Sequence, residues 1–135
     1  MLQFYFLAIA LNALAGYILI AGDEFGVLEF KSSFSLKDET LRLVLGVLSM
    51  VTGLLKILSP IDGDIPVVGD LLPALSCLLS GFVLTFEYYR DRSSISASDR
   101  TEKINNLLIR NKKIVGVISI ITAVLHFLFP KVLLL

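Results

Sequence analysis

The sequence predicts an all-α integral membrane protein with four transmembrane helices, and three observations support this prediction. Of the 135 residues, 56% are hydrophobic and 18% are charged, and the mean hydropathy is +0.83. Soluble domains are instead about 45–50% apolar and about a quarter charged. The apolar residues gather in runs of roughly twenty, the length that a helix needs to cross a bilayer, and the charged residues gather between these runs. These features exclude a disordered chain, a basic nucleic-acid-binding protein and an ordinary soluble domain.

Four apolar runs are long enough to be spans, and they lie at 2–22, 41–59, 70–89 and 114–134. We expect each to be helical, because backbone N–H and C=O groups inside lipid must be satisfied within the segment. The first run is not expected to be a cleaved signal peptide, because no Lys or Arg precedes it. The whole chain, 1–135, is therefore predicted to form a single membrane domain.

The basic residues predict the orientation of these spans. Successive connections lie on alternate sides of the membrane, and ten of the twelve Lys and Arg residues lie in or beside connections 23–40 and 90–113. Lys56 and Lys131 fall on the other side. By the positive-inside rule, both long connections are cytoplasmic and both termini lie outside the plasma (inner) membrane. The formal net charge is zero, so we predict no nucleic-acid partner.

A cytoplasmic amphipathic helix is predicted at 99–113, before the last span. Asp99 and Glu102 form a capping box at its start. An apolar face lies beside a basic one, with Ile104, Leu107 and Leu108 against Arg100, Lys103, Arg110, Lys112 and Lys113. We expect this helix to bind anionic lipids of the inner leaflet. The alternative is a solvated basic linker that only sets the topology.

An internal repeat is predicted from two similar segments. Residues 46–60 and 116–130 align at a constant offset of seventy, and seven of the fifteen positions are identical. Membrane helices share a restricted set of residues, so chance similarity is the alternative to a duplication. Under a duplication, the chain consists of two tandem helical hairpins related by a pseudo-two-fold axis along the membrane normal.

Polar and small residues recur on one face of the second and fourth spans. In the ordinary interpretation, these residues let the helices pack closely and form hydrogen bonds between them. In the functional alternative, they line a pathway through the membrane. Asn12, at the middle of the first span, requires a partner on another helix or subunit. The candidate polar membrane or ligand contacts are Asn12, Ser49, Thr52, Lys56, Ser119, Thr122 and His126.

Lys56 and His126 occupy equivalent positions of the repeat, each four residues before the proline that ends its span. We expect Lys56 to anchor its span at the outer interface, since a lysine at that depth reaches the headgroups. The alternative is a site for an anionic headgroup or ligand. His126 is expected to be a packed or interfacial side chain rather than a ligand or proton carrier. At the inner interface, Glu87 is expected to pair with Arg90, three residues later.

Three carboxylates lie close together in and after the short connection between the second and third spans, and they are weak candidates for a cation site: Asp62, Asp64 and Asp70. The ordinary interpretation is a turn followed by a helix cap, and we predict no metal and no cofactor. With one Cys and one His, the chain offers neither a disulfide nor the ligands of a zinc site. No catalytic motif is present, so we expect the protein not to be an enzyme.

The second span matches the spacing R-x3-G-x6-G-x2-K at Arg42, Gly46, Gly53 and Lys56. This resembles the signature of DoxX-like four-helix membrane proteins, small subunits found beside oxidoreductases and in assembly roles, in which the signature lies in the first span. The related quinone-linked thiol oxidoreductases need paired cysteines, and this chain has a single one. Residues 59–66, SPIDGDIP, are similar to the SPID-x-IP segment of YkvA-like membrane proteins.

For function, we expect a non-catalytic accessory or assembly subunit that packs against partner membrane helices or against copies of itself. The alternative is a small oligomeric channel or transporter for ions or small solutes. The depth of polar groups discriminates between the two, because a pathway requires polar groups at several levels of the membrane. In the sequence, only Asn12 and a few hydroxyl groups occupy the middle of the spans, which favours the subunit.

Overall fold

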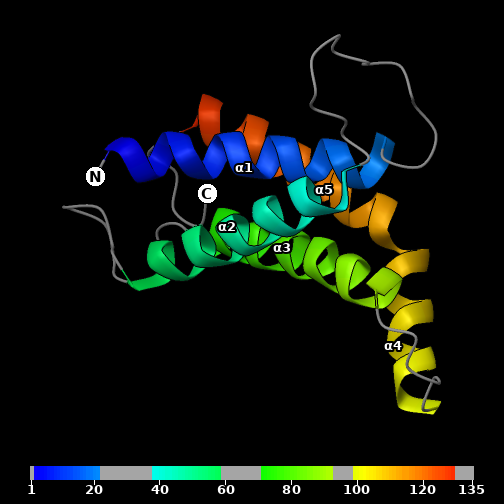
Figure 1. Cartoon of the computed structure of the whole chain (residues 1–135). Helices are drawn as coiled ribbons and strands as arrows, with labels where there is room; N and C mark the ends of the chain where they lie inside the picture. Colours follow the sequence, from blue (N-terminus) through cyan, green and yellow to red (C-terminus); the bar gives the residue numbers. More distant parts are fainter. Residues whose placement is uncertain (1, 22–37, 59–70, 93–98, 130–135) are drawn as a thin grey trace, which may run out of the picture.

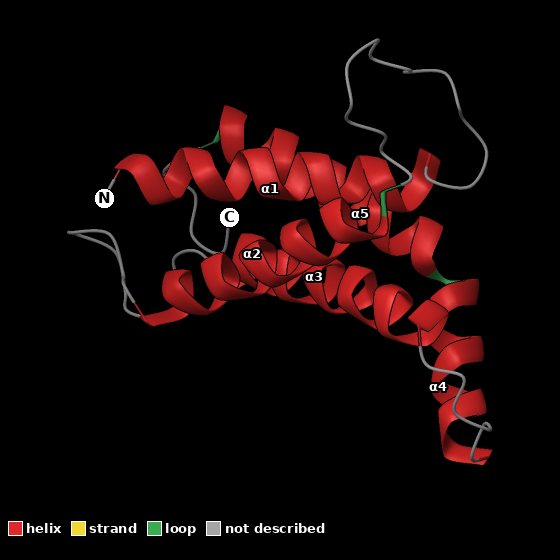
Figure 2. Ribbon diagram, viewed as in Figure 1, coloured by secondary structure: helices red, strands yellow, loops and turns green. Residues whose placement is uncertain are grey.

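The computed structural model describes residues 2–21, 38–58, 71–92 and 99–129, and all of these except Asp38, Asn111 and Phe129 are helical (Figure 1, Figure 2). Within these ranges there is no β-strand, and the fold class is all-α. The helices, in chain order, are α1 (Leu2–Ala21), α2 (Glu39–Leu58), α3 (Leu71–Arg92), α4 (Asp99–Arg110) and α5 (Lys112–Leu128).

Three of these helices, α1, α2 and α3, are long and apolar enough to cross a membrane. α5 covers the described part of the fourth predicted span, whose residues 130–134 lie outside the described residues. The connections 22–37 and 59–70 also lie outside them. The predicted turn and helix cap, and the absence of a metal at Asp62, Asp64 and Asp70, therefore stay predictions.

The predicted cytoplasmic helix 99–113 is divided at Asn111. α4 ends at Arg110, and α5 begins at Lys112 and runs in a different direction (Figure 1). Asn111 has φ −100° and ψ 4°, close to the bridge region between helical and extended backbone, and its side chain makes no capping hydrogen bond. Lys112 and Lys113 therefore belong to the long helix α5 and not to the amphipathic helix.

Four helices lie side by side in a bundle, and α4 leaves this bundle at one end (Figure 1). α1 packs most closely against α5, and α2 packs most closely against α3. Smaller contacts join α1 to α2 and α3, and α3 to α5, whereas the described parts of α2 and α5 have no close backbone approach. The two helices of the second and fourth predicted spans are thus separated by α1 and α3.

Pairs of glycines set the two closest helix contacts. A Cβ atom built on Gly116 of α5 would lie 2.7 Å from the carbonyl oxygen of Gly16 in α1. In the other pair, a Cβ atom on Gly81 of α3 would lie 2.6 Å from the carbonyl oxygen of Gly46 in α2. Glycine lets two helix backbones touch, which increases van der Waals contact between them. Any larger residue at these positions would force the helices apart.

Apolar side chains cover the outside of the bundle as well as part of its inside. The buried apolar cluster is small and consists of Ala15, Ile18, Leu19, Val83 and Leu84. The outer face of α2 is apolar from its second turn to its end, with exposed Val44, Val47, Leu48, Val51, Leu54, Leu55 and Leu58. A continuous exposed apolar surface of this kind marks a contact with lipid or with another protein.

The glycine contact between α1 and α5 gives a first prediction. We expect Gly116→Ala to lower the free energy of unfolding by about 1–3 kcal/mol, the usual cost of adding a methyl group to a tightly packed contact. The cost arises because the new Cβ meets backbone, which cannot rotate away. Val117→Ala, at the neighbouring exposed position, is the control. Reversible unfolding in mixed detergent, followed by circular dichroism, measures both, and equal stability of the two variants would contradict the close approach.

Candidate functional site

All seven sequence candidates for polar contacts lie inside the bundle, each with an exposed fraction of at most 5%. They are Asn12, Ser49, Thr52, Lys56, Ser119, Thr122 and His126. The structure adds four buried polar side chains that were not among these candidates: Ser76, Ser80, Glu87 and Lys112. The bundle is therefore apolar outside and has a polar interior.

Polar side chains on α2 and α5 include one set on each helix with a heptad spacing, and all but the half-buried Arg42 are buried. In α2, Arg42, Ser49 and Lys56 are seven residues apart, and in α5, Lys112, Ser119 and His126 repeat the pattern. Seven residues are close to two helical turns, so each set lies on one face, at intervals of about 10 Å along the helix. The sets define three levels, which together we call the polar axis. The Lys56 level consists of Tyr5, Lys56 and His126. The middle level consists of Asn12, Ser49, Ser76 and Ser119, and the Glu87 level consists of Arg42, Glu87 and Lys112.

At the Lys56 level, side chains from three helices meet. Lys56 Nζ lies 2.8 Å from His126 Nε2, which joins α2 to α5. The Tyr5 ring of α1 lies 4.6 Å from the His126 ring, centroid to centroid, and 5.7 Å from Lys56 Nζ. The Tyr5 hydroxyl donates a hydrogen bond of 2.5 Å to the backbone carbonyl of His126. Lys56 is 5% exposed, so its amino group points into the bundle and not along an outer face.

The middle level has no charged side chain among the described residues. Asn12 Nδ2 donates a hydrogen bond of 3.2 Å to the carbonyl of Pro73, in the first turn of α3. The hydroxyls of Ser76 and Ser119 lie 3.2 Å apart and join α3 to α5. Two fully buried atoms have no hydrogen-bond partner among the described residues, namely Asn12 Oδ1 and Ser49 Oγ. A buried polar atom without a partner costs about 1–3 kcal/mol, so both positions require an explanation.

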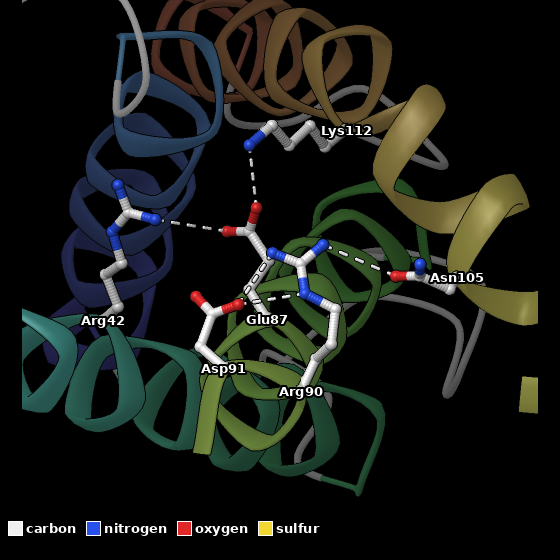
Figure 3. Close-up of polar contacts among 6 residues, drawn as sticks. All are labelled: Arg42, Glu87, Arg90, Asp91, Asn105 and Lys112. Carbon is white, nitrogen blue, oxygen red and sulfur yellow. Dashed lines mark hydrogen bonds and ion pairs between the residues drawn. The ribbon is translucent and has the colours of Figure 1, made fainter. Parts of the chain in front are cut away.

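At the Glu87 level, one carboxylate joins three helices (Figure 3). Glu87 of α3 is 3% exposed, and its Oε1 lies 2.8 Å from Lys112 Nζ of α5. Its Oε2 lies 3.5 Å from Arg42 Nη1 of α2. A carboxylate is stable in such a buried position only with cationic partners and hydrogen bonds. The two cations lie at equivalent heptad positions of α2 and α5, and Glu87 therefore holds these helices together at this end.

The predicted pairing of Glu87 with Arg90 is wrong. Arg90 lies beside Asp91, with Nη2 to Oδ1 at 2.8 Å, and its Nη1 donates to Asn105 of α4 at 3.4 Å (Figure 3). Glu87 faces the interior, where cations from two other helices reach it, whereas Arg90 lies near the end of α3 and faces α4. Spacing along one helix could not reveal those distant partners.

The structure offers no metal centre in the part of the chain that it describes, where no group of three His, Cys, Asp or Glu side chains comes together. Cys77 is buried in α3, and its thiol donates to the carbonyl of Ala8 at 3.8 Å. The contacts that the polar axis does contain are hydrogen bonds and ion pairs.

Comparison with known proteins gives a family but no activity. A protein-family model matches residues 1–126. The chain is also 35% identical to an uncharacterized protein of Treponema pallidum (strain Nichols), over the full length of both chains. No solved structure matches the chain. The resemblances to DoxX-like and YkvA-like proteins stay predictions. An identity of this size, extending from end to end, shows that the chain and the Treponema pallidum protein belong to one protein family.

Proposed function

We propose that the protein is inserted in the plasma (inner) membrane through four spans, and that its polar axis is the pathway of a small transporter or channel for ions or small solutes. Insertion is supported by three helices of sufficient length and hydropathy, and by the apolar outer surface of the bundle. The observation that carries the pathway is the burial of polar side chains at all three levels, including the middle one.

The depth of polar groups, which discriminates between a subunit and a pathway, supports the pathway. From the sequence alone, Asn12 and the hydroxyls were equally able to face a partner protein. In the bundle, the same groups point inward, and Asn12 contacts the backbone of α3 in its own chain. A polar group in a membrane is costly and is retained where it has a structural or functional use. A subunit that recruits partners through these groups would need them on its outer faces.

The orientation follows from the charge at the two ends. The Glu87 level adjoins α4 and the basic residues Arg90, Arg92 and Lys113, which the positive-inside rule assigns to the cytoplasm. The Lys56 level then lies toward the outside, together with both termini. Four helices enclose little space, so conduction along the polar axis is expected to need a rearrangement between the two hairpins or the assembly of several copies.

Close helix contacts support the proposed internal duplication. An offset of 65 relates α1 to α3, and an offset of seventy relates α2 to α5, so that the glycine pair Gly16–Gly116 corresponds to Gly81–Gly46. Both pairs are backbone contacts of the same kind. The weaker contacts correspond as well, because α1 with α2 matches α3 with α5. A pseudo-two-fold axis between α1 and α3 would produce this arrangement.

Two hydrogen bonds between α1 and α3 are also related by the offset of 65 residues. Asn12 Nδ2 donates to the carbonyl of Pro73, and at the positions offset by 65, Cys77 Sγ donates to the carbonyl of Ala8. The duplication also explains why Ser49 Oγ has no partner among the described residues. Ser49 corresponds to Ser119, whose hydroxyl contacts that of Ser76 in α3. In α1, the residue equivalent to Ser76 is Leu11, which has no hydroxyl to offer Ser49.

A labelling experiment tests the four spans and their orientation. In a Cys77→Ser background, Gln3→Cys and Lys103→Cys each introduce one exposed thiol, at the start of α1 and in α4. We expect a membrane-impermeant maleimide to label Gln3→Cys in intact cells, and to label Lys103→Cys only after permeabilisation. Labelling of both cysteines in intact cells, or of neither before permeabilisation, would contradict three membrane crossings between residues 3 and 103. Labelling of Lys103→Cys in intact cells and of Gln3→Cys only after permeabilisation would contradict the proposed orientation.

Flux measurements test the pathway. The purified full chain is reconstituted in liposomes, and potassium, chloride and proton gradients are followed with ion-selective and pH-sensitive dyes. We expect flux of at least one probe above that of empty liposomes, and a loss of about tenfold or more in Asn12→Leu, equivalent to about 1.4 kcal/mol or more. The control is Ala10→Leu, which adds the same side chain at an exposed position of α1.

The opposite results would favour the subunit. If none of the probes moves and the protein co-purifies from native membranes with one defined membrane protein, the pathway is wrong and the accessory role is supported. The apolar outer face of α2 offers the surface on which such a partner would pack. Equal flux in Asn12→Leu and Ala10→Leu would also contradict the polar axis as the route.

A further inference from the structure

We propose that the polar axis carries protons, with the Lys56–His126 pair as the proton-binding site at one end and Glu87 as the site at the other. This inference rests on the proposed transport function and names its substrate. It departs from the expectation that His126 is only a packed side chain, because the structure shows what His126 contacts.

The distance between Lys56 Nζ and His126 Nε2 limits how many protons the pair holds. At 2.8 Å the two nitrogens are hydrogen-bonded, so one atom donates a proton and the other presents a lone pair. In one state the ammonium donates to a neutral imidazole that carries its own proton on Nδ1. In the other, the imidazole N–H donates to a neutral amine. The pair therefore holds one proton between the two atoms.

A second proton on this pair would break the bond. With protons on both nitrogens, two N–H donors and two positive charges would face each other inside the bundle, where like charges repel strongly. The pair must then release a proton or separate. Because α2 and α5 have no close backbone approach in the described residues, and this bond joins their ends, proton binding at the Lys56 level also loosens the contact between them.

The groups around the pair suit a proton site. Tyr5 of α1 lies against both side chains, and its ring face attracts the ammonium group of Lys56. On α3, the buried thiol of Cys77 donates to the carbonyl of Ala8 instead. Two helices thus contribute the basic groups of the site, and α1 contributes a phenol.

The middle level supplies the relay. Asn12 and Ser49 each lie seven residues, or about 10 Å, from the Lys56 level, on helices that run in opposite directions. Asn12 Oδ1 and Ser49 Oγ are fully buried and lack partners among the described residues, and an ordered water bonded to them would satisfy both. A chain of such waters would accept a proton from one neighbour and give another to the next. The Ser76 hydroxyl donates to the Ser119 hydroxyl, which itself donates to the carbonyl of Val115 at 2.9 Å, so this contact joins α3 to α5 and is not part of the relay.

The middle level suits a proton better than a metal cation. A cation that leaves its hydration shell needs several oxygen ligands, with carboxylates for tight binding. The middle level offers one amide oxygen and serine hydroxyls, and no carboxylate among the described residues. A proton needs only a continuous chain of donors and acceptors. At the Glu87 level a buried carboxylate can accept a proton and release Lys112 and Arg42 as it becomes neutral. Waters would have to carry the proton past the apolar cluster that contains Ile18, Leu19, Val83 and Leu84.

Proton flux tests this inference separately from transport in general. Liposomes containing the full chain are loaded with a pH-sensitive dye, and a potassium gradient with valinomycin drives protons inward. We expect a proton flux that falls by about tenfold or more in Lys56→Met and in His126→Phe, and that remains in Ala10→Leu. In the flux measurements without valinomycin, movement of potassium or chloride combined with no proton flux here would overturn the proton inference alone. The absence of every flux would overturn the transport proposal with it.

The single histidine allows the pair itself to be observed. His126 is the only histidine of the chain, so labelling with ¹⁵N-histidine gives one imidazole spectrum from the protein in lipid nanodiscs. We expect the His126 Nε2 resonance to show a hydrogen bond that disappears in Lys56→Met, while Ala10→Leu leaves the resonance unchanged. An Nε2 resonance that is identical in the wild-type protein and in Lys56→Met would overturn the pair as a shared proton site.

Discussion

The structure depends on one constraint: the polar side chains of a bundle with an apolar exterior must find their partners inside it. This constraint places Lys56 against His126, and Glu87 between two cations. Both contacts join α2 to α5, whose described backbones do not approach each other closely. The glycine pairs then set the distances within α1–α5 and α2–α3. Without the interior polar contacts, α2 and α5 would be connected only through the helices that separate them.

Much of the fold could be predicted from the sequence, because the limits of an apolar run are set by local composition. The second predicted span, 41–59, corresponds to α2 at Glu39–Leu58, and the third, 70–89, corresponds to α3 at Leu71–Arg92. The break at Asn111 could not be predicted, because residues on both sides favour a helix, and the change of direction depends on where α5 packs. Membrane insertion and orientation remain proposals that rest on composition and charge.

The inward face of each span could also be predicted, whereas the pairing of the spans could not. The spacing of Ser49 and Lys56 indicates a shared helix face but not which helix covers it. Glu87 illustrates the difference, because local spacing suggested Arg90, and its partners are Arg42 and Lys112, which lie 45 and 25 residues away. The heptad spacing of Arg42 with Ser49 and of Lys112 with Ser119 indicates that the two cations share the inward faces of their helices, but it does not indicate that Glu87 lies between them.

Cross-linking within the polar axis tests the central claim, that the polar faces meet inside one chain. In a Cys77→Ser background, the pair Ser76→Cys and Ser119→Cys replaces two hydroxyls that lie 3.2 Å apart, a separation compatible with a disulfide after small adjustments. Mild oxidation in the membrane, followed by non-reducing electrophoresis and mass spectrometry, identifies the product. The account predicts an intramolecular disulfide in a monomer. A disulfide-linked dimer, or two free thiols after oxidation, would contradict a polar axis enclosed by the bundle.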